Sequence, residues 1–130
     1  MRSLFLSLLL SAVFVLPAGA AVDTSKLQLP GDITLEQART VVEGALEFAK
    51  KQGVPMNITV VDAGGNLKAF CRMDGAFLGS IDISQKKAVT ARRFNMSSAE
   101  LGGLAQPGKE LFGIEATNGG LAIFGGGELL

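Results

Sequence analysis

Arg72 and Asp74 are charged residues at a position suited to ligand chemistry, where the chain is predicted to leave a sheet. They lie in the stretch Arg72-Met73-Asp74-Gly75, directly after an alternating, strand-like run. Polar groups at the end of a strand are well placed to meet a ligand, because the sheet fixes them while the loop leaves them accessible. The alternative is a solvated arginine and an aspartate that forms a turn with the glycine after it. The sequence leaves both interpretations open.

The segment that positions this corner, residues 57–73, is predicted to be a β-hairpin. Its two halves alternate in the way strands do, and Gly64, Gly65 and Asn66 between them tolerate the positive φ angles of a tight turn. Cys71 shares one strand face with apolar residues, so we expect it to be buried. It is the single cysteine of the chain, which leaves it no partner for an intramolecular disulfide.

Helical periodicity predicts three helices around the hairpin. The first opens with a capping box at 34–37 and ends at Gly53. The second is expected over 81–94, where the loop after the hairpin should fold it back onto the sheet. The third opens with a capping box at 97–100 and ends before Pro107.

Two short strands are expected after these helices. Leu121–Phe124 is an apolar run, and Glu128–Leu130 resembles the beginning of another strand after three glycines. Helices and strands in this order indicate an α+β fold. The order would ordinarily be completed by more sheet and a closing helix, so we expect the domain to be incomplete at its C-terminus.

The N-terminus predicts export. Arg2 precedes a leucine-rich run, and Ala18-Gly19-Ala20 has the small-x-small pattern of a signal-peptidase site. We therefore expect residues 1–20 to be a signal peptide and the mature protein to be periplasmic or secreted. The run falls short of the about 20 apolar residues that span a membrane, so no stable membrane span is expected after cleavage. An uncleaved anchor is the alternative.

Domain organisation and composition narrow the function further. Residues 21–32 are expected to be an N-terminal tether and 33–130 a single domain. Basic and acidic residues number 12 each, which argues against nucleic-acid binding. The chain has no histidine, so Ser/His/Asp and Cys/His catalysis is excluded, and no zinc-ligand spacing occurs. The residue content favours a non-enzymatic role.

Five sequence blocks occur in a specific order and spacing, although each block alone is a weak signal. The blocks are VVDAGGNL at 60–67, RMDGA at 72–76, Ser84 with KAVTA at 87–91, QPG at 106–108 and TNGGLAIFGGG at 117–127. Together they resemble the GlcG/HbpS-like family, whose domain also occurs at the C-terminus of PduO-type cobalamin adenosyltransferases.

The resemblance implies an antiparallel sheet of about five strands with helices packed against it, and assembly into higher homo-oligomers. It also implies an association with haem or related tetrapyrroles. Family members continue beyond the glycine-rich block with a further strand and a final helix. The last strand and helix are therefore expected to be missing here, which leaves a gap that a neighbouring subunit would fill.

Haem binding gives the charged residues specific roles. Without histidine or tyrosine, the axial candidates are the sulfur atoms of methionine and cysteine and the side-chain nitrogen or oxygen of lysine and threonine. Among them Met73 is a weak candidate that more readily belongs to the core. Arg72 and Lys87 would pair with the two propionates, with Asp74 beside the first. Thr90, one turn after Lys87, would face the same side, unless its hydroxyl bonds back to its own helix.

Two functions follow from the sequence. The first is an exported small-ligand binding protein for haem or a related tetrapyrrole. The alternative is an oligomer-forming structural or accessory subunit without a ligand of its own, as a degenerate, truncated relative would be. A spectral titration with haem distinguishes them.

Overall fold

The computed structural model describes residues 31–130, which form three α-helices, a two-stranded antiparallel sheet and one 3₁₀ turn. The predicted signal peptide and nearly all of the predicted tether lie outside the described residues. The α+β class predicted from the sequence is confirmed. In chain order the elements are α1 (Leu35–Gln52), β1 (Asn57–Val61), β2 (Leu67–Arg72), α2 (Ser80–Phe94), α3 (Ser98–Leu104) and η2 (Ile114–Ala116).

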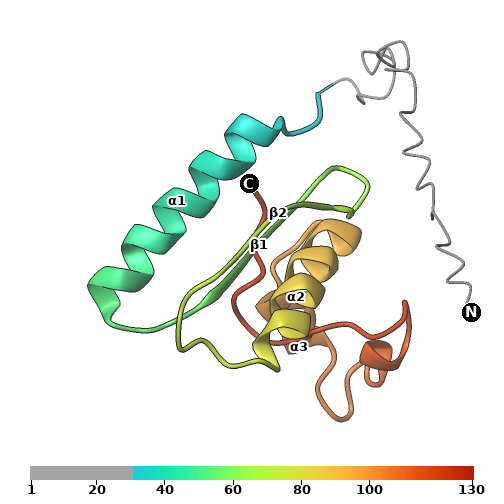
Figure 1. Ribbon diagram of the computed structural model, residues 1–130. Helices are drawn as coiled ribbons and strands as arrows, with labels where there is room; N and C mark the ends of the chain where they lie inside the picture. Colours follow the sequence, from blue (N-terminus) through green and yellow to red (C-terminus); the bar gives the residue numbers. More distant parts are fainter. Residues whose placement is uncertain (1–30) are drawn as a thin grey trace, which may run out of the picture.

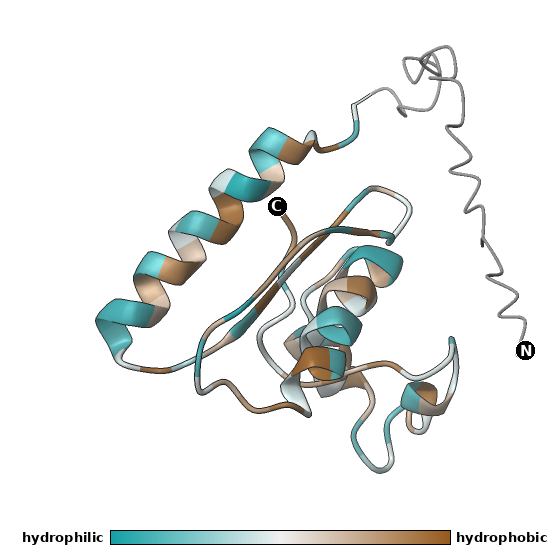
Figure 2. Cartoon of the chain, viewed as in Figure 1, coloured by the Kyte–Doolittle hydropathy of each residue, from teal (hydrophilic) through white to brown (hydrophobic). Residues whose placement is uncertain are grey.

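The hairpin lies between α1 on one side and α2 with α3 on the other (Figure 1). Strand alternation explains this, because Val60 joins Ala38 and Val42 of α1 in a buried apolar cluster, while the opposite strand face meets α2. On that second face the hydroxyls of Thr59 and Ser84 are 2.9 Å apart. Apolar segments alternate with hydrophilic ones along α1 in Figure 2, as expected for a helix with one buried side.

The predicted helix ends are confirmed. Thr34 Oγ1 accepts from Gln37 N at 3.2 Å, Gln37 Oε1 accepts from Thr34 N at 2.9 Å, and α1 ends at Gly53 with φ of 68°. A second capping box opens α3. There the backbone N–H of Ser97 donates to the Glu100 carboxylate, and this bond lowers the pKa of Glu100.

The hairpin turn is built around the Asp62 carboxylate. Its Oδ1 accepts from the backbone N–H groups of Gly64 at 2.9 Å and Asn66 at 2.8 Å, and Gly65 takes the positive φ of 78° that the turn requires. The ladder then pairs Ile58 with Cys71. Cys71 packs against the core cluster but is half-buried, less enclosed than the sequence predicted.

The expected strands Leu121–Phe124 and Glu128–Leu130 do not form in the structure, so the described residues hold two strands where the family resemblance implied about five. In place of a ladder, backbone groups of this segment bond to side-chain hydroxyls and to backbone groups of other segments. Ala122 N donates to Thr90 Oγ1 at 3.1 Å, and Gly127 N donates to Ser98 Oγ at 2.9 Å. The prediction of strands here was wrong for the described part of the chain.

Two glycines let this C-terminal segment approach the helices. A Cβ on Gly102 would overlap Ile123 O, and a Cβ on Gly127 would overlap Lys87 O. The segment therefore packs by backbone-to-backbone contact on α2 and α3. None of the helices over residues 31–130 has the length and apolarity needed to cross a membrane.

Candidate ligand site at the open end of the hairpin

Arg72 ends β2 with an exposed side chain. It lies opposite Asn57, the first residue of β1, and the two form the last cross-strand pair at this end of the sheet. Within residues 31–130 no hydrogen bond or ion pair engages its guanidinium. An arginine held on a strand with unused donors is suited to bind a carboxylate.

Asn57 draws an apolar loop to the same end of the hairpin. Its Nδ2 donates to the backbone oxygen of Phe77 at 3.1 Å, while its Oδ1 is buried and accepts no hydrogen bond from the described residues. The side chains that follow are open to solvent, with Phe77 83% exposed and Leu78 72% exposed. The Asn57 hydrogen bond therefore brings this exposed apolar loop to the end of the hairpin at which Arg72 lies.

Two methionines flank the same corner. Met73 N donates to Met56 O at 3.0 Å, and Met56 N donates to the Met73 thioether at 3.4 Å, so the two residues extend the pairing one step beyond the strands. Met56 is 42% exposed and Met73 is half-buried. Sequence reasoning placed Met73 on the strand face but did not bring Met56 beside it.

Asp74 lies in the turn that leaves the hairpin. Ala76 N donates to Met73 O at 3.1 Å across it, and Gly75 has a positive φ of 81°. The Asp74 side chain is exposed. The turn role weighed from the sequence thus applies to its backbone, and its carboxylate stays accessible at the edge of the corner.

Lys87 has different surroundings. Its Nζ lies 4.2 Å from the centroid of the Phe124 ring, near Gly126, and burial lowers the pKa of the amine. These contacts go to the C-terminal segment, and no described contact or pocket joins Lys87 to Arg72. Arg72 and Lys87, which were expected to bind the two propionates together, are therefore not joined by any described contact.

Thr90 is fully buried. Its hydroxyl accepts from Ala122 N at 3.1 Å, which anchors the C-terminal segment to α2. In this structure the Thr90 side chain is occupied inside the fold. The sequence predicted that Thr90 would face a ligand on the same side of α2 as Lys87, and its burial does not agree with that prediction.

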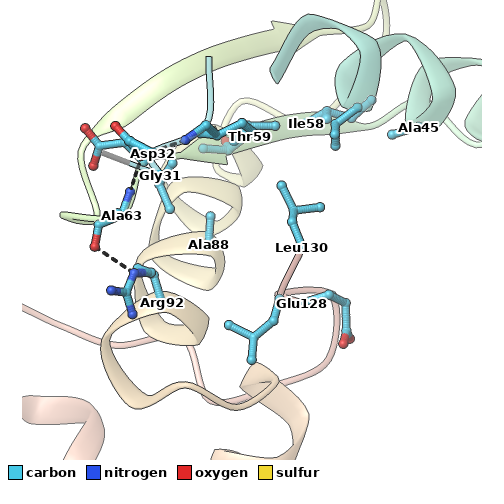
Figure 3. Close-up of a pocket in the computed structure, with 17 residues that line it drawn as sticks. Gly31, Asp32, Ala45, Ile58, Thr59, Ala63, Ala88, Arg92, Glu128 and Leu130 are labelled. Atoms are coloured by element: carbon cyan, nitrogen blue, oxygen red, sulfur yellow. Dashed lines mark hydrogen bonds between the residues drawn. The ribbon is translucent and has the colours of Figure 1, made fainter. Parts of the chain in front are cut away.

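A separate groove runs along the outer edge of β1, with a volume of about 560 Å³ (Figure 3). Ile58, Thr59 and Val60 form one wall. Arg92 closes the hairpin end, where its Nε donates to Ala63 O at 2.6 Å, and Asp32 Oδ1 accepts from Ala63 N at 2.8 Å. Arg92 carried no recognisable signal in the sequence, because its role depends on where α2 meets the hairpin turn.

Ligation of a metal by several charged or thiol groups finds no support in residues 31–130. No three His, Cys, Asp or Glu side chains gather there. The groups available at the hairpin corner are a guanidinium, two thioethers and an apolar surface.

The sequence of the chain is similar to a known protein family and to several known proteins. The family model described as "Haem degrading protein HbpS-like" matches residues 33–130. A 15.0 kDa protein from the dhaT-dhaS intergenic region of Citrobacter freundii is 39% identical, over 79% of this chain and 73% of its own length. The corrinoid adenosyltransferase PduO of Salmonella typhimurium is 34% identical over 82% of this chain. The matched region spans 32% of the length of PduO.

Two solved structures are similar to the fold. The Klebsiella pneumoniae protein ORFY superposes with a TM-score of 0.72 at 37% identity, covering 76% of this chain and 69% of its own. A structure described as a PduOC:heme complex has a TM-score of 0.69 at 33% identity, covering 72% of this chain and 69% of its own.

Proposed function

Because the chain belongs to the HbpS-like family, we propose that it is an exported protein that binds haem or a related tetrapyrrole. A relative at 33% identity is described in complex with haem, which supports the ligand class. Export rests on the leucine-rich N-terminus and the Ala18-Gly19-Ala20 pattern, and it implies a periplasmic or secreted protein.

The observation that carries the proposal is the exposed apolar surface beside Arg72. A tetrapyrrole has a broad apolar ring and two carboxylates, so its site needs an apolar platform next to a cation. Phe77 and Leu78 supply the platform, since they are 83% and 72% exposed, and their loop is tied to Asn57 across from Arg72.

The corner residues fit haem in a particular manner. The Arg72 fork would pair with a propionate, and the side chains of Phe77 and Leu78 would cover part of the ring. The iron, when bound, supplies a Lewis acid for soft ligands, and the thioethers of Met56 and Met73 would offer sulfur at this corner. Asp74 repels a propionate, so its role would be to accept a hydrogen bond from a ligand donor.

Lys87 and Thr90 are proposed as secondary groups. Lys87 Nζ lies 4.2 Å from the centroid of the Phe124 ring, at the C-terminal segment, and Thr90 is fully buried with its hydroxyl accepting from Ala122 N. Arg72 is therefore the primary anchor, with a larger effect on affinity than either of them.

A Soret titration tests the proposal. Arg72→Ala and Phe77→Ala should each weaken haem binding by roughly 1 to 3 kcal/mol, and Arg72→Lys should also weaken it because a point charge lacks the bidentate fork. Arg39→Ala is the matched control, since Arg39 is an exposed arginine on α1. Met73→Leu should change the Soret band only if the thioether ligates iron, because the two side chains have similar volume.

The alternative function is a structural subunit without a ligand. It is favoured by the internal contacts of Lys87 and Thr90, two of the four residues expected to bind. If the wild-type protein gives no saturable Soret shift with haem, the structural-subunit function replaces the haem-binding function. If Arg72→Ala binds haem as tightly as the wild type, haem remains the ligand, but this corner is not its binding site.

A further inference from the structure

The turn at residues 117–120 holds the one Asn-Gly pair of the chain. Gly120 N donates to Thr117 O at 2.9 Å, and the two residues between them have positive φ, 55° at Asn118 and 75° at Gly119. This pattern is typical of a type I′ turn, which favours asparagine followed by glycine. The carboxamide of Asn118 is thus followed by a peptide nitrogen that no Cβ shields.

Few contacts restrain the two groups that would react with each other in this turn. Asn118 and Gly119 are both exposed. Within residues 31–130 the Asn118 carboxamide bonds only to its neighbour, with Nδ2 donating to Thr117 Oγ1 at 2.9 Å. No described hydrogen bond engages the N–H of Gly119. The side-chain carbon Cγ of Asn118 and the nitrogen of Gly119 are therefore both available.

Arg93, in the last turn of α2, contacts the same peptide group. Its Nη1 donates to Asn118 O at 3.0 Å, and this oxygen shares its peptide group with the nitrogen of Gly119. When the N–H of Gly119 loses its proton, the negative charge is delocalised onto Asn118 O, where the guanidinium stabilises it through a charge-assisted hydrogen bond. Arg93 should therefore make this peptide nitrogen easier to deprotonate.

We propose that Asn118 is a site of intramolecular deamidation in the folded protein, promoted by Arg93. The deprotonated nitrogen of Gly119 attacks Asn118 Cγ and closes a succinimide ring. The bond from Cγ to Nδ2 breaks, and this nitrogen takes up a proton and leaves as ammonia. Water then opens the ring at either carbonyl, which gives aspartate or isoaspartate. The whole sequence consumes one water, releases one ammonia and transfers no electrons.

The modification would act on the anchoring of the C-terminal segment. Isoaspartate lengthens the main chain by one methylene group and adds a carboxylate beside Arg93. The anchors follow within a few residues, because Leu121 N donates to Glu115 O at 3.0 Å and Ala122 N donates to Thr90 Oγ1 at 3.1 Å. Ageing should therefore loosen the docking of this segment on α2, independently of haem binding.

Peptide mapping by mass spectrometry tests the site, on the full protein aged in heavy-oxygen water at mildly alkaline pH. The peptide that contains Asn118 should gain one heavy oxygen atom and separate into aspartate and isoaspartate forms. Asn95 is the internal control, because it also has a positive φ, 50°, but is followed by Met96, whose side chain hinders ring closure. If Asn118 stays intact in the folded protein, the proposal is overturned, whether or not the urea-unfolded chain deamidates.

Variants of Arg93 test its role. Arg93→Ala should slow the loss of Asn118 by about threefold to tenfold, and Arg93→Lys should recover part of the rate because it keeps a positive donor. Arg39→Ala, which removes an exposed arginine of α1, should leave the rate unchanged. Equal rates in the wild type and Arg93→Ala would overturn the promoting role. In the aged protein the amide of Ala122 should exchange faster, and unchanged exchange would overturn the loosening of the segment.

Discussion

Ser98 and Gly127 hold each other through two reciprocal hydrogen bonds. Ser98 N donates to Gly127 O at 2.9 Å, and Gly127 N donates to Ser98 Oγ at 2.9 Å. The same hydroxyl donates to Phe124 O at 2.7 Å. One buried side chain thus fixes the glycine-rich C-terminal segment to the first turn of α3.

Ser98→Ala should therefore destabilise the fold by roughly 1 to 3 kcal/mol, because it leaves the buried N–H of Gly127 without its partner and also removes the donor to Phe124 O. Urea unfolding followed by circular dichroism measures the loss. Ser97→Ala is a useful comparison, since it removes only the cap of α3 and should cost about 1 kcal/mol. Equal stability of Ser98→Ala and wild type would contradict the anchoring role.

Gly102 and Gly103 are neighbours in α3 with opposite expectations. A Cβ at Gly102 would overlap Ile123 O, so Gly102→Ala should destabilise by about 1 to 3 kcal/mol or displace the C-terminal segment. A Cβ at Gly103 meets nothing within 4 Å, so Gly103→Ala should gain up to about 1 kcal/mol from helix propensity. Thermal unfolding of the two variants side by side checks the contrast.

Asp62 should make stability fall in acid. Hydrogen bonds led by the backbone N–H of Asn66 lower the pKa of Asp62 below the ordinary 3.8 of an aspartate, so the unfolded state takes up the proton first as the pH falls. Its contribution is complete above pH 3.8 and is lost as the pH falls through the folded pKa. Asp62→Asn should flatten this part of the curve, as measured by denaturant unfolding from pH 6 to about pH 2. The unfolding free energy of Asp62→Asn should still fall slightly in acid, because the pKa of Glu100 is also lowered.

The N-terminus can be tested by intact mass. Cleavage after Ala20 gives an exported protein that begins at Ala21. A mass that includes Met1 in the exported fraction would reject the signal peptide and favour the uncleaved anchor.

Local patterns predicted the helix ends and the hairpin well. The two capping boxes, the helix end at Gly53 and the turn around Asp62 all depend on residues within a few positions of one another. Such contacts are specified by residue type and spacing, so the sequence alone is sufficient for them.

The position of the C-terminal segment was not predictable in the same way. Leu121–Phe124 has the composition of a strand, but its backbone bonds go to Thr90 and Ser98, which are distant in the sequence. Thr90 was expected to face a ligand, but it is buried and its hydroxyl anchors this segment by accepting from Ala122 N. The exposure of Arg72 and Asp74 could be predicted because they follow a strand, whereas the position of Phe77 depends on a loop contact with Asn57.

The long reach of the Thr90 and Ser98 contacts also bears on how the chain folds. The hairpin closes a turn of a few residues, whereas these anchors close loops of 26 to 32 residues. Hairpin contacts are therefore expected to form before the folding barrier is crossed, and the C-terminal segment to dock after it. Variants that loosen this docking should accelerate unfolding while leaving the refolding rate nearly unchanged, so that the segment governs the lifetime of the native state more than the speed of its formation.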